Sequence, residues 1–149
     1  MARNYLQGTF TPTKPEKYVG NVNNITFRSS WERKAMLFFD TTPSILKWAS
    51  EEHIIPYISP VDNRPHRYFV DFVVQCKTKS GDIKTYAVEI KPKVQCEPPK
   101  TPKRQTKSFL ESVQTYAVNQ AKWKAAEAWC SKNKMEFLIL TEYELGIVR

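Results

Sequence analysis

The sequence predicts a single α/β domain in which a small mixed β-sheet is flanked by helices. Three observations lead to this class. Two apolar stretches rich in β-branched and aromatic residues surround a polar turn at 79–82, which predicts an antiparallel strand pair. A short helical pattern precedes this pair, and a long helical pattern with a further apolar run follows it. The length of 149 residues suits one domain with a substantial core.

The first 24 residues show little periodicity and are rich in Asn, Thr, Pro, Lys and Gly. We therefore expect an extended N-terminal arm over residues 1–24 and a single domain over residues 25–149. A short helix is predicted from 29 to about 40, with Ser29 or Ser30 as its N-cap and Thr-Thr-Pro at its end. Three apolar side chains recur in it at helical spacing: Trp31, Ala35 and Phe38.

Two strands follow, over Ile45–Trp48 and Ile54–Ile58. Pro56 has no N–H to donate to a neighbouring strand, so the second strand is expected at a sheet edge. Residues 60–67 then predict a loop that carries Arg64, His66 and Arg67.

The central strand pair spans residues 68–93 and contains three ionisable side chains. Asp71 is expected in the middle of the first strand, whereas Glu89 and Lys91, two residues apart, share one face of the second. Burying such groups among apolar residues costs free energy unless they are paired or bind a metal. We therefore interpret the hairpin as the platform of a functional site.

The C-terminal third predicts a loop, a long helix and a strand. Four prolines among the basic residues of 92–107 argue against a helix or an inner strand, so we expect a mobile basic loop there. A helix is predicted from 107 to about 132, covering the sheet with one apolar stripe. The stripe consists of Phe109, Val113, Tyr116, Trp123 and Cys130. Residues 135–141 suit an inner strand, and residues 142–149 give no assignment.

The chain carries a net charge of +8, and nine of its basic residues fall between 77 and 107. This excess favours a nucleic acid as the partner, with a solvated basic surface as the alternative. No apolar run approaches membrane-spanning length, so we expect no membrane contact. The three cysteines lie far apart in the sequence, which is typical of reduced thiols in an intracellular protein.

Two reaction classes lack support in this sequence. His53 and His66 are its two histidines, and neither lies near a candidate nucleophile, which argues against Ser-His-Asp and Cys-His mechanisms. The four glycines are isolated from one another, so there is no phosphate-cradling loop and we expect no nucleotide cofactor.

The charged groups of the hairpin match the needs of metal-assisted phosphodiester hydrolysis. We expect Asp71 and Glu89 to hold one Mg²⁺, helped by the backbone carbonyl of Ile90. Lys91, beside Glu89, is then placed to orient or activate the attacking water. Charged residues on an exposed strand face would produce the same spacing, and that alternative stays open.

These residues resemble the PD-(D/E)xK nuclease core. Val-Asp-Phe at 70–72 is followed by Val-Glu-Ile-Lys-Pro at 88–92, with Val70 where the family's name has Pro. Further segments are similar to the TnsA-type branch of that superfamily, namely 27–34 (Phe-Arg-Ser-Ser-Trp-Glu-Arg-Lys), Trp48, 50–52, 55–57 and 67–69. The lead-in at 17–21 (Lys-Tyr-Val-Gly-Asn) and the stretch from 91 to 99 resemble the head-completion nucleases of T-even-like tailed phages.

The resemblance implies a restriction-endonuclease-like core and a Mg²⁺-dependent DNA endonuclease, with Mn²⁺ able to substitute. It also implies that the protein trims packaged double-stranded DNA at the filled head before tail joining. The partners would include phage capsid or portal proteins, and the location would be the host cytoplasm or the virion. In such nucleases the early-helix carboxylate, here Glu32, joins Asp71 and Glu89 around the metals, and Lys91 is catalytic.

Glu32 also has a purely structural explanation. Ser29 to Glu32 fits a capping box, in which Ser29 accepts from the Glu32 N–H and the Glu32 side chain bonds back to the Ser29 N–H. On that interpretation Glu32 only fixes the start of the helix.

Several side chains outside the core are candidates for DNA contacts. The basic ones are Arg64, Arg67, Lys93, Lys100, Lys103, Arg104 and Lys107. The basic loop either closes over a phosphate backbone or is a solvated linker. Gln120 falls on the apolar stripe of the long helix, where it either contacts DNA or is a satisfied structural amide. For the whole protein, the alternative function is a non-catalytic basic assembly factor that binds packaged DNA or fills a portal.

Overall fold

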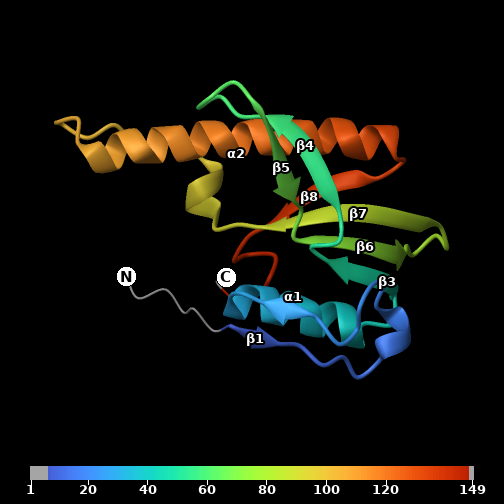
Figure 1. Cartoon of the computed structure of the whole chain (residues 1–149). Coiled ribbons are helices and arrows are strands. Elements are labelled where there is room, and N and C mark those ends of the chain that lie inside the picture. The colour runs from blue at the N-terminus through green and yellow to red at the C-terminus, as the bar shows by residue number, and fades with distance from the viewer. Residues whose placement is uncertain (1–6, 148–149) are drawn as a thin grey trace.

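The computed structural model describes residues 7–147 and places helices on both faces of a four-stranded sheet (Figure 1). The strands lie in the order β3 (Ile45–Ser50), β6 (Phe72–Lys77), β7 (Ile83–Ile90) and β8 (Glu136–Leu140). β6 is antiparallel to β3 and β7, whereas β7 and β8 are parallel. The predicted small mixed sheet with flanking helices is confirmed.

The predicted central hairpin forms, but its first strand is shorter than expected. β6 pairs with β7 from Phe72 opposite Val88 to Lys77 opposite Ile83. The chain leaves the sheet at residues 70–71, so Asp71 precedes β6 instead of lying in the middle of a strand.

The break before β6 reverses the faces that the side chains cover. Tyr68 and Val70 pack in the core cluster beneath the long helix, whereas Phe72 and Val74 pack in the cluster on the opposite side of the sheet. In one continuous strand these four alternate residues would share a face. The interruption at Asp71 lets the chain contribute to both cores.

Residues before the break form a separate two-stranded sheet. β4 (Ile54–Ile58) pairs with β5 (Pro65–Phe69), so the predicted loop over 60–67 is wrong at its C-terminal end. His66 and Arg67 lie on β5, and Arg64 stays in the turn. Each strand of a two-stranded sheet is an edge, which confirms the edge position expected from Pro56.

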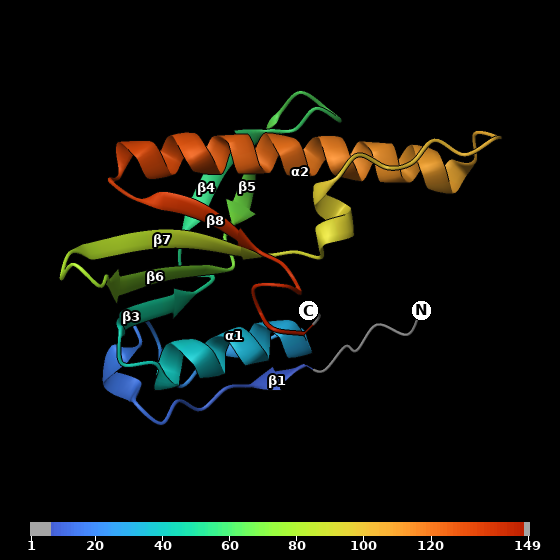
Figure 2. The same ribbon diagram turned by 180° about the vertical axis from the view of Figure 1, so that it is seen from behind.

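α1 (Ser30–Thr41) and the preceding segment cover one face of the sheet (Figure 2). Ser29 is the N-cap, and its side chain accepts a hydrogen bond from the Glu32 N–H. The buried apolar face consists of Ala35, Met36 and Phe39, while the Phe38 side chain is exposed. Phe38 therefore has the helical spacing that the sequence predicts, but it does not belong to the buried face of the helix.

The described part of the expected N-terminal arm, residues 7–24, packs against the domain. It contains β1 (Gly8–Thr9), which pairs with β2 (Thr26–Phe27), and the 3-10 turn η1 (Pro15–Lys17). The buried Lys17 ammonium donates to the carbonyl oxygens of Phe39, Asp40 and Thr42 and so caps the end of α1. Residues 1–6 of the expected arm lie outside the described residues.

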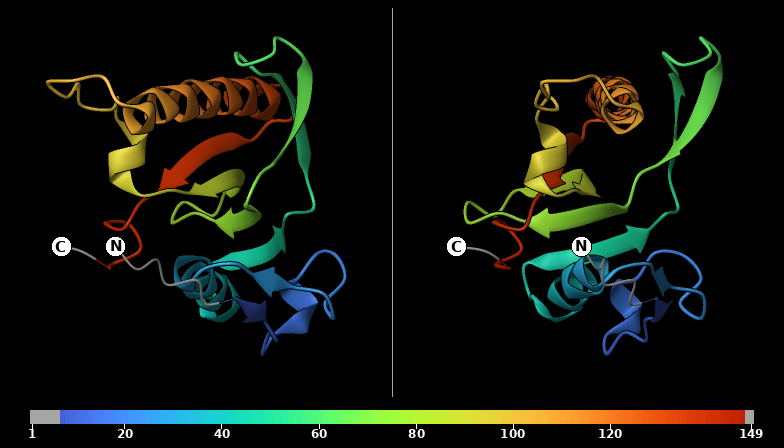
Figure 3. Two further views of the ribbon diagram at one scale, coloured as in Figure 1. Left: turned by 60° about the vertical axis from the view of Figure 1, so that its left-hand side comes forward. Right: turned by 90° about the vertical axis from the view of Figure 1, so that its left-hand side faces the viewer.

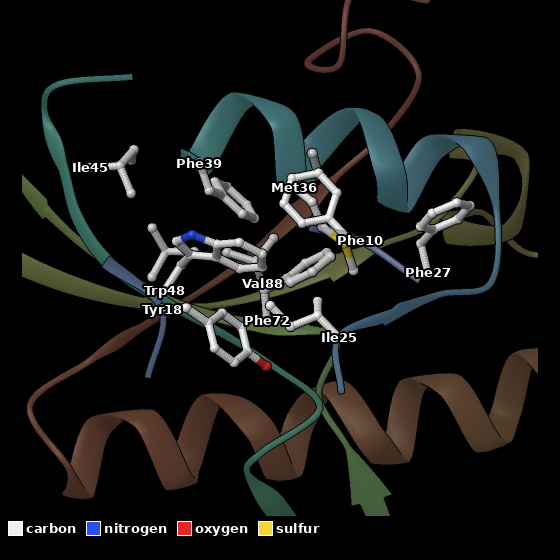
Figure 4. Close-up of a cluster of buried hydrophobic side chains, with 12 residues drawn as sticks. Phe10, Tyr18, Ile25, Phe27, Met36, Phe39, Ile45, Trp48, Phe72 and Val88 are labelled. Carbon is white, nitrogen blue, oxygen red and sulfur yellow. The ribbon is translucent and has the colours of Figure 1, made fainter. Parts of the chain in front are cut away.

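The core on this side is aromatic (Figure 4). The Trp48 ring lies 4.7 Å from Tyr18, 5.8 Å from Phe10 and 5.9 Å from Phe39, centroid to centroid. Tilted and edge-on aromatic pairs of this kind stabilise a core beyond the area they bury. The N-terminal segment is thus joined to α1 and the sheet through one tryptophan.

α2 (Lys107–Lys132) covers the other face of the sheet (Figure 1). Its C-terminal half carries the buried side chains Trp123, Ala126 and Cys130, whereas Val113 in the N-terminal half is exposed. The predicted stripe therefore contacts the core only over the second half of the helix.

β8 is an edge strand of the described sheet, so its predicted inner position is wrong. Phe137 and Ile139 pack towards α2, while Leu140 packs against the cluster on the α1 side. Because both faces of β8 contribute to a core, its sequence is apolar from Phe137 to Leu140 and reads like that of an inner strand.

Between β7 and α2 the chain is mostly irregular. The 3-10 turn η2 (Lys93–Cys96) is followed by residues 97–106, whose backbone forms neither helix nor strand. Within residues 7–147, no helix is both long and apolar enough to span a membrane.

Candidate active site

The candidate site lies at the end of the sheet where β3 and β7 finish and β6 begins. Ser50 is opposite Phe72, and Phe72 is opposite Val88. The next residues along these strands therefore bring Asp71 and Glu89 together. The residue that follows β3, Glu51, donates its backbone N–H to the Asp71 carbonyl over 3.0 Å.

Asp71 is fixed by a hydrogen bond across the hairpin. The backbone N–H of Ile90 donates to Asp71 Oδ2 over 2.8 Å. Burial raises the pKa of the Asp71 carboxyl well above its usual value, and the nearby Glu89 charge raises it further. A buried carboxylate next to a second carboxylate is a costly arrangement, which is typical of functional sites.

Glu89 is buried, with 6% of its surface exposed. One carboxylate oxygen, Oε2, lies 3.3 Å from the Lys91 ammonium. The other, Oε1, accepts a hydrogen bond from the Tyr68 hydroxyl. Both oxygens of Glu89 are therefore oriented by neighbouring side chains.

Tyr68 is a site residue that the sequence does not single out. Burial and the Glu89 charge raise the pKa of its hydroxyl, so the hydroxyl keeps its proton and acts as a donor. Identifying Tyr68 as a site residue requires knowing that the chain breaks at residues 70–71. In one continuous strand its side chain would share a face with Phe72 and Val74. The sequence carries no local signal of that break.

Lys91 follows β7 immediately, and its backbone N–H donates to the Leu140 carbonyl of β8 over 3.0 Å. Its side chain is 22% exposed. The ammonium is therefore held beside Glu89 while a part of the side chain remains accessible to solvent or substrate.

Glu32 stands at the start of α1 and is half-buried. Its Oε2 accepts a hydrogen bond from the Ser29 hydroxyl over 3.3 Å, where a capping box would use the Ser29 N–H. Burial raises the pKa of Glu32, while the Ser29 hydrogen bond lowers it. The Glu32 charge also contributes to the raised pKa of Asp71, which places the two carboxyl groups within electrostatic reach.

The residues of this site fit a hard divalent cation. Within residues 7–147, no three His, Cys, Asp or Glu side chains form a ready-made metal cluster. Mg²⁺ does not need one, since it is commonly bound by one or two carboxylates and keeps several waters. Asp71 and Glu89 supply two such carboxylates. Burial and then the Glu89 charge raise the Asp71 pKa, and a cation between the two carboxylates would offset both effects.

The side chains predicted to contact DNA do not form one cluster. Arg64 and Arg67 belong to the β4–β5 hairpin on one side of α2, and the loop with Lys100, Lys103 and Arg104 lies on the other (Figure 3). β7 runs towards the end of the molecule from which this loop protrudes (Figure 1). The three basic residues of the loop are exposed, as are Lys93 and Lys107 on either side of it.

Gln120 does not lie on the buried face of α2, so its predicted place on the apolar stripe is wrong, while its contact with DNA stays a prediction. Its side chain is exposed, and the neighbouring Asn119 is the buried amide of the helix, with 7% exposed. The error follows from the helical period. The buried face runs through Asn119, Trp123, Ala126 and Cys130, so Gln120, one residue after Asn119, falls beside it.

Similarities to known proteins bear on this site. Residues 42–142 match the family model described as TnsA-like endonuclease N terminal. The chain is also 37% identical over 139 residues to the head completion nuclease of Enterobacteria phage T4, covering 91% of this chain and 90% of the relative. Asp71, Glu89 and Lys91 lie within the span of the family model, and Glu32 lies before it.

Proposed function

Because the chain belongs to the TnsA-like endonuclease family, we propose that it is a Mg²⁺-dependent DNA endonuclease that hydrolyses phosphodiester bonds at Asp71, Glu89 and Lys91. The observation that carries this proposal is the buried carboxylate pair where β6 begins and β7 ends, with a lysine ammonium 3.3 Å from one member. A stability role alone gives no reason to place two repelling carboxylates side by side.

Asp71 and Glu89 are the proposed metal ligands. The Ile90 N–H orients Asp71, and Tyr68 and Lys91 orient Glu89, so both carboxylates are held in position before a ligand arrives. When bound, Mg²⁺ would supply positive charge for a phosphate oxygen and lower the pKa of a coordinated water. Mn²⁺ is expected to substitute. The Ile90 carbonyl remains a candidate third ligand.

Lys91 is the proposed catalytic residue. Its ammonium has three donors, of which one faces Glu89. The others can orient the attacking water and donate to a phosphate oxygen as negative charge develops. The backbone of Lys91 is anchored to β8, and its ammonium lies beside Glu89 before any substrate is bound.

Glu32 is proposed as a further carboxylate of the metal site. Its support is the electrostatic influence on Asp71. The hydrogen bond from the Ser29 hydroxyl supports the structural alternative equally. We propose that Glu32 holds a second metal or a water, and its substitution by Gln separates the two roles.

Double-stranded DNA is the proposed substrate, gripped through phosphate contacts. The basic loop with Lys100, Lys103 and Arg104, flanked by Lys93 and Lys107, protrudes from the end of the molecule towards which β7 runs (Figure 1). Exposed Lys and Arg side chains bind phosphates with little dependence on base sequence. Arg64 and Arg67 on the β4–β5 hairpin would make contacts on the other side of α2.

The biological step is proposed from the relative's name. The similar protein of Enterobacteria phage T4 is a head completion nuclease, and the similarity covers nearly the whole of both chains. We propose that this protein trims DNA during phage head completion, before tail joining, in contact with capsid or portal proteins. It would act in the host cytoplasm or as a part of the virion.

Incubation with supercoiled plasmid tests the proposed chemistry. We expect nicking and linearisation with Mg²⁺ and none with EDTA. Asp71→Ala, Glu89→Ala and Lys91→Ala should each abolish cleavage while circular dichroism shows a folded protein, because each removes a metal ligand or the charge beside the attacking water. DNA binding without any metal-dependent cutting would favour the alternative function of a basic assembly factor.

A further inference from the structure

Arg28 and Glu51 form an ion pair beside the candidate site, and neither belongs to the proposed catalytic set. Arg28 lies between β2 and the N-cap of α1, while Glu51 follows β3. Arg28 Nε donates to Glu51 Oε1 over 3.1 Å, and Arg28 Nη2 donates to Oε2 over 2.9 Å. This two-pronged contact fixes the plane of the guanidinium group as well as its position.

Glu51 is itself fixed against the site. Its backbone N–H donates to the Asp71 carbonyl over 3.0 Å. Its φ is +53°, in the left-handed region that side chains other than Gly rarely adopt. A non-glycine residue kept in this conformation next to a candidate catalytic aspartate is typical of a functional constraint. Arg28 is therefore attached to Asp71 through one rigid residue.

The guanidinium group retains capacity for a ligand. Arginine has five N–H donors, and the contacts with Glu51 use two of them. The Arg28 side chain is 57% exposed, whereas that of Glu51 is 28% exposed. The hydrogen bonds and charge of Glu51, followed by the charges of Glu32 and Asp71, raise the pKa of Arg28, so the cation lies within reach of the acidic site.

We propose that Arg28 binds a phosphate of the DNA backbone next to the cleaved bond, and that Glu51 is the positioning residue that presents it. The proposal rests on the proposed nuclease function and adds a substrate-binding residue to that site. Lys91 pairs with Glu89 and is 22% exposed, so Arg28 is the more accessible of the two cations. A phosphodiester oxygen is the ligand that matches a planar group with several further donors.

The competing explanation is an ordinary surface ion pair. Such pairs contribute little to stability, and on this explanation Arg28 makes no contact with the substrate. The two explanations differ in what the removal of Arg28 changes. An ordinary pair predicts unchanged DNA binding, whereas a phosphate contact predicts weaker binding with a smaller salt dependence.

The first experiment measures binding of a labelled DNA duplex in EDTA over a range of salt concentrations, by fluorescence anisotropy. Arg28→Gln should reduce the slope of log K against log salt by roughly 0.9, the value for one bound phosphate. Arg33→Gln is the matched control, because Arg33 is an exposed arginine of the neighbouring α1 that contacts the Phe27 ring instead of a site carboxylate. An unchanged slope for Arg28→Gln, or an equal reduction for both variants, overturns the proposal.

The second experiment tests the role of Glu51 through cleavage kinetics. Glu51→Gln keeps the backbone contact with Asp71 but weakens the grip on Arg28, so kcat/KM should fall in the parent protein. In the Arg28→Gln background the same change should have little further effect, because the partner is already gone. Independent, multiplicative reductions in the double variant would overturn the positioning role.

A conservative variant completes the test. Arg28→Lys keeps the charge but cannot make the two-pronged contact. Its slope of log K against log salt should therefore equal that of the parent, while its kcat/KM should stay low. Full recovery of kcat/KM by Lys would contradict positioning by Glu51. A parent protein that binds DNA and never cuts it would overturn the proposed function, while the binding slopes would still decide the role of Arg28.

Discussion

At the scale of single residues, the raised pKa of Asp71 means that its ionised carboxylate destabilises the folded protein. The folded form holds its proton more tightly than the unfolded chain, whose Asp groups titrate at about 3.9. Stability therefore falls as the pH rises from the unfolded value through the raised folded value, and the full cost is present above it. At neutral pH, the Asp71 carboxyl therefore lowers the stability of the folded protein.

Asp71→Asn should remove this cost. The Asn carbonyl can still accept from the Ile90 N–H, so the variant should melt at a higher temperature than the parent at pH 7 in EDTA. The difference should shrink as the pH falls towards about 4, because the parent aspartate is then protonated.

Asp62→Asn is the control for this prediction. Asp62 is exposed, and its hydrogen bond with His66 lowers its pKa, so neutralising it should not raise the melting temperature. Melting curves are recorded at a series of pH values. An Asp71→Asn melting temperature no higher than that of the parent at pH 7 would contradict the destabilising effect of Asp71.

Glu32→Gln separates the two roles proposed for Glu32. The amide oxygen of Gln can still accept from the Ser29 hydroxyl, so the start of α1 should survive. Removal of a cap costs about 1 kcal/mol, and the melting temperature should stay within a few degrees of the parent. Cleavage should fall steeply, because a neutral amide is a much poorer Mg²⁺ ligand than a carboxylate.

Glu127→Gln provides the matched control, since Glu127 is an exposed helical glutamate on α2. It should match the parent in both assays. Normal cutting by Glu32→Gln would return Glu32 to a structural role and leave Asp71, Glu89 and Lys91 as the catalytic set.

At the scale of elements, the local patterns predict most of the helices and strands. The capping serine of α1, the polar turn between β6 and β7, and the edge position of Pro56 follow from backbone chemistry within a few residues. These signals depend on neighbours in the sequence and not on the tertiary fold. The hairpin that carries Glu89 and Lys91, with Asp71 just before it, can therefore be predicted from the sequence.

The remaining features depend on contacts between distant segments. The break at Asp71 arises because Tyr68 and Phe72 pack into different cores, and no local residue marks it. Asn119 is buried and Gln120 exposed because the face of α2 that meets the core runs through Asn119, Trp123 and Cys130. The hydrogen bond between Tyr68 and Glu89 likewise appears only once the chain is folded.

The basic loop before α2 makes a prediction at the same scale. Changing Lys100, Lys103 and Arg104 together to Gln should weaken DNA binding and reduce the slope of log K against log salt by up to about 2.7, or roughly 0.9 for each phosphate that is no longer bound. Lys124, Lys132 and Lys134, which are exposed in the C-terminal half of α2 and just beyond it, form the matched control triple. Equal slopes for the loop variant and the parent would make the loop a linker.

At the scale of the whole molecule, the sheet separates two cores that meet at the candidate site. The α1 side is an aromatic cluster around Trp48, and the α2 side contains Trp123, Ala126 and Cys130. Both sides contribute to the site, since Glu32 comes from α1 and Tyr68 from the cluster beneath α2. The complete fold is thus needed to preorganise the carboxylates.

The central claim is that Asp71 and Glu89 bind a divalent metal, and a crystal soaked in Mn²⁺ tests it most directly. Anomalous density would locate the ion independently of any activity. We predict a peak in contact with the carboxylates of both Asp71 and Glu89, and its disappearance in a Glu89→Ala crystal soaked in the same way. A fully occupied Mn²⁺ bound elsewhere, or no peak between these two side chains, would contradict the claim.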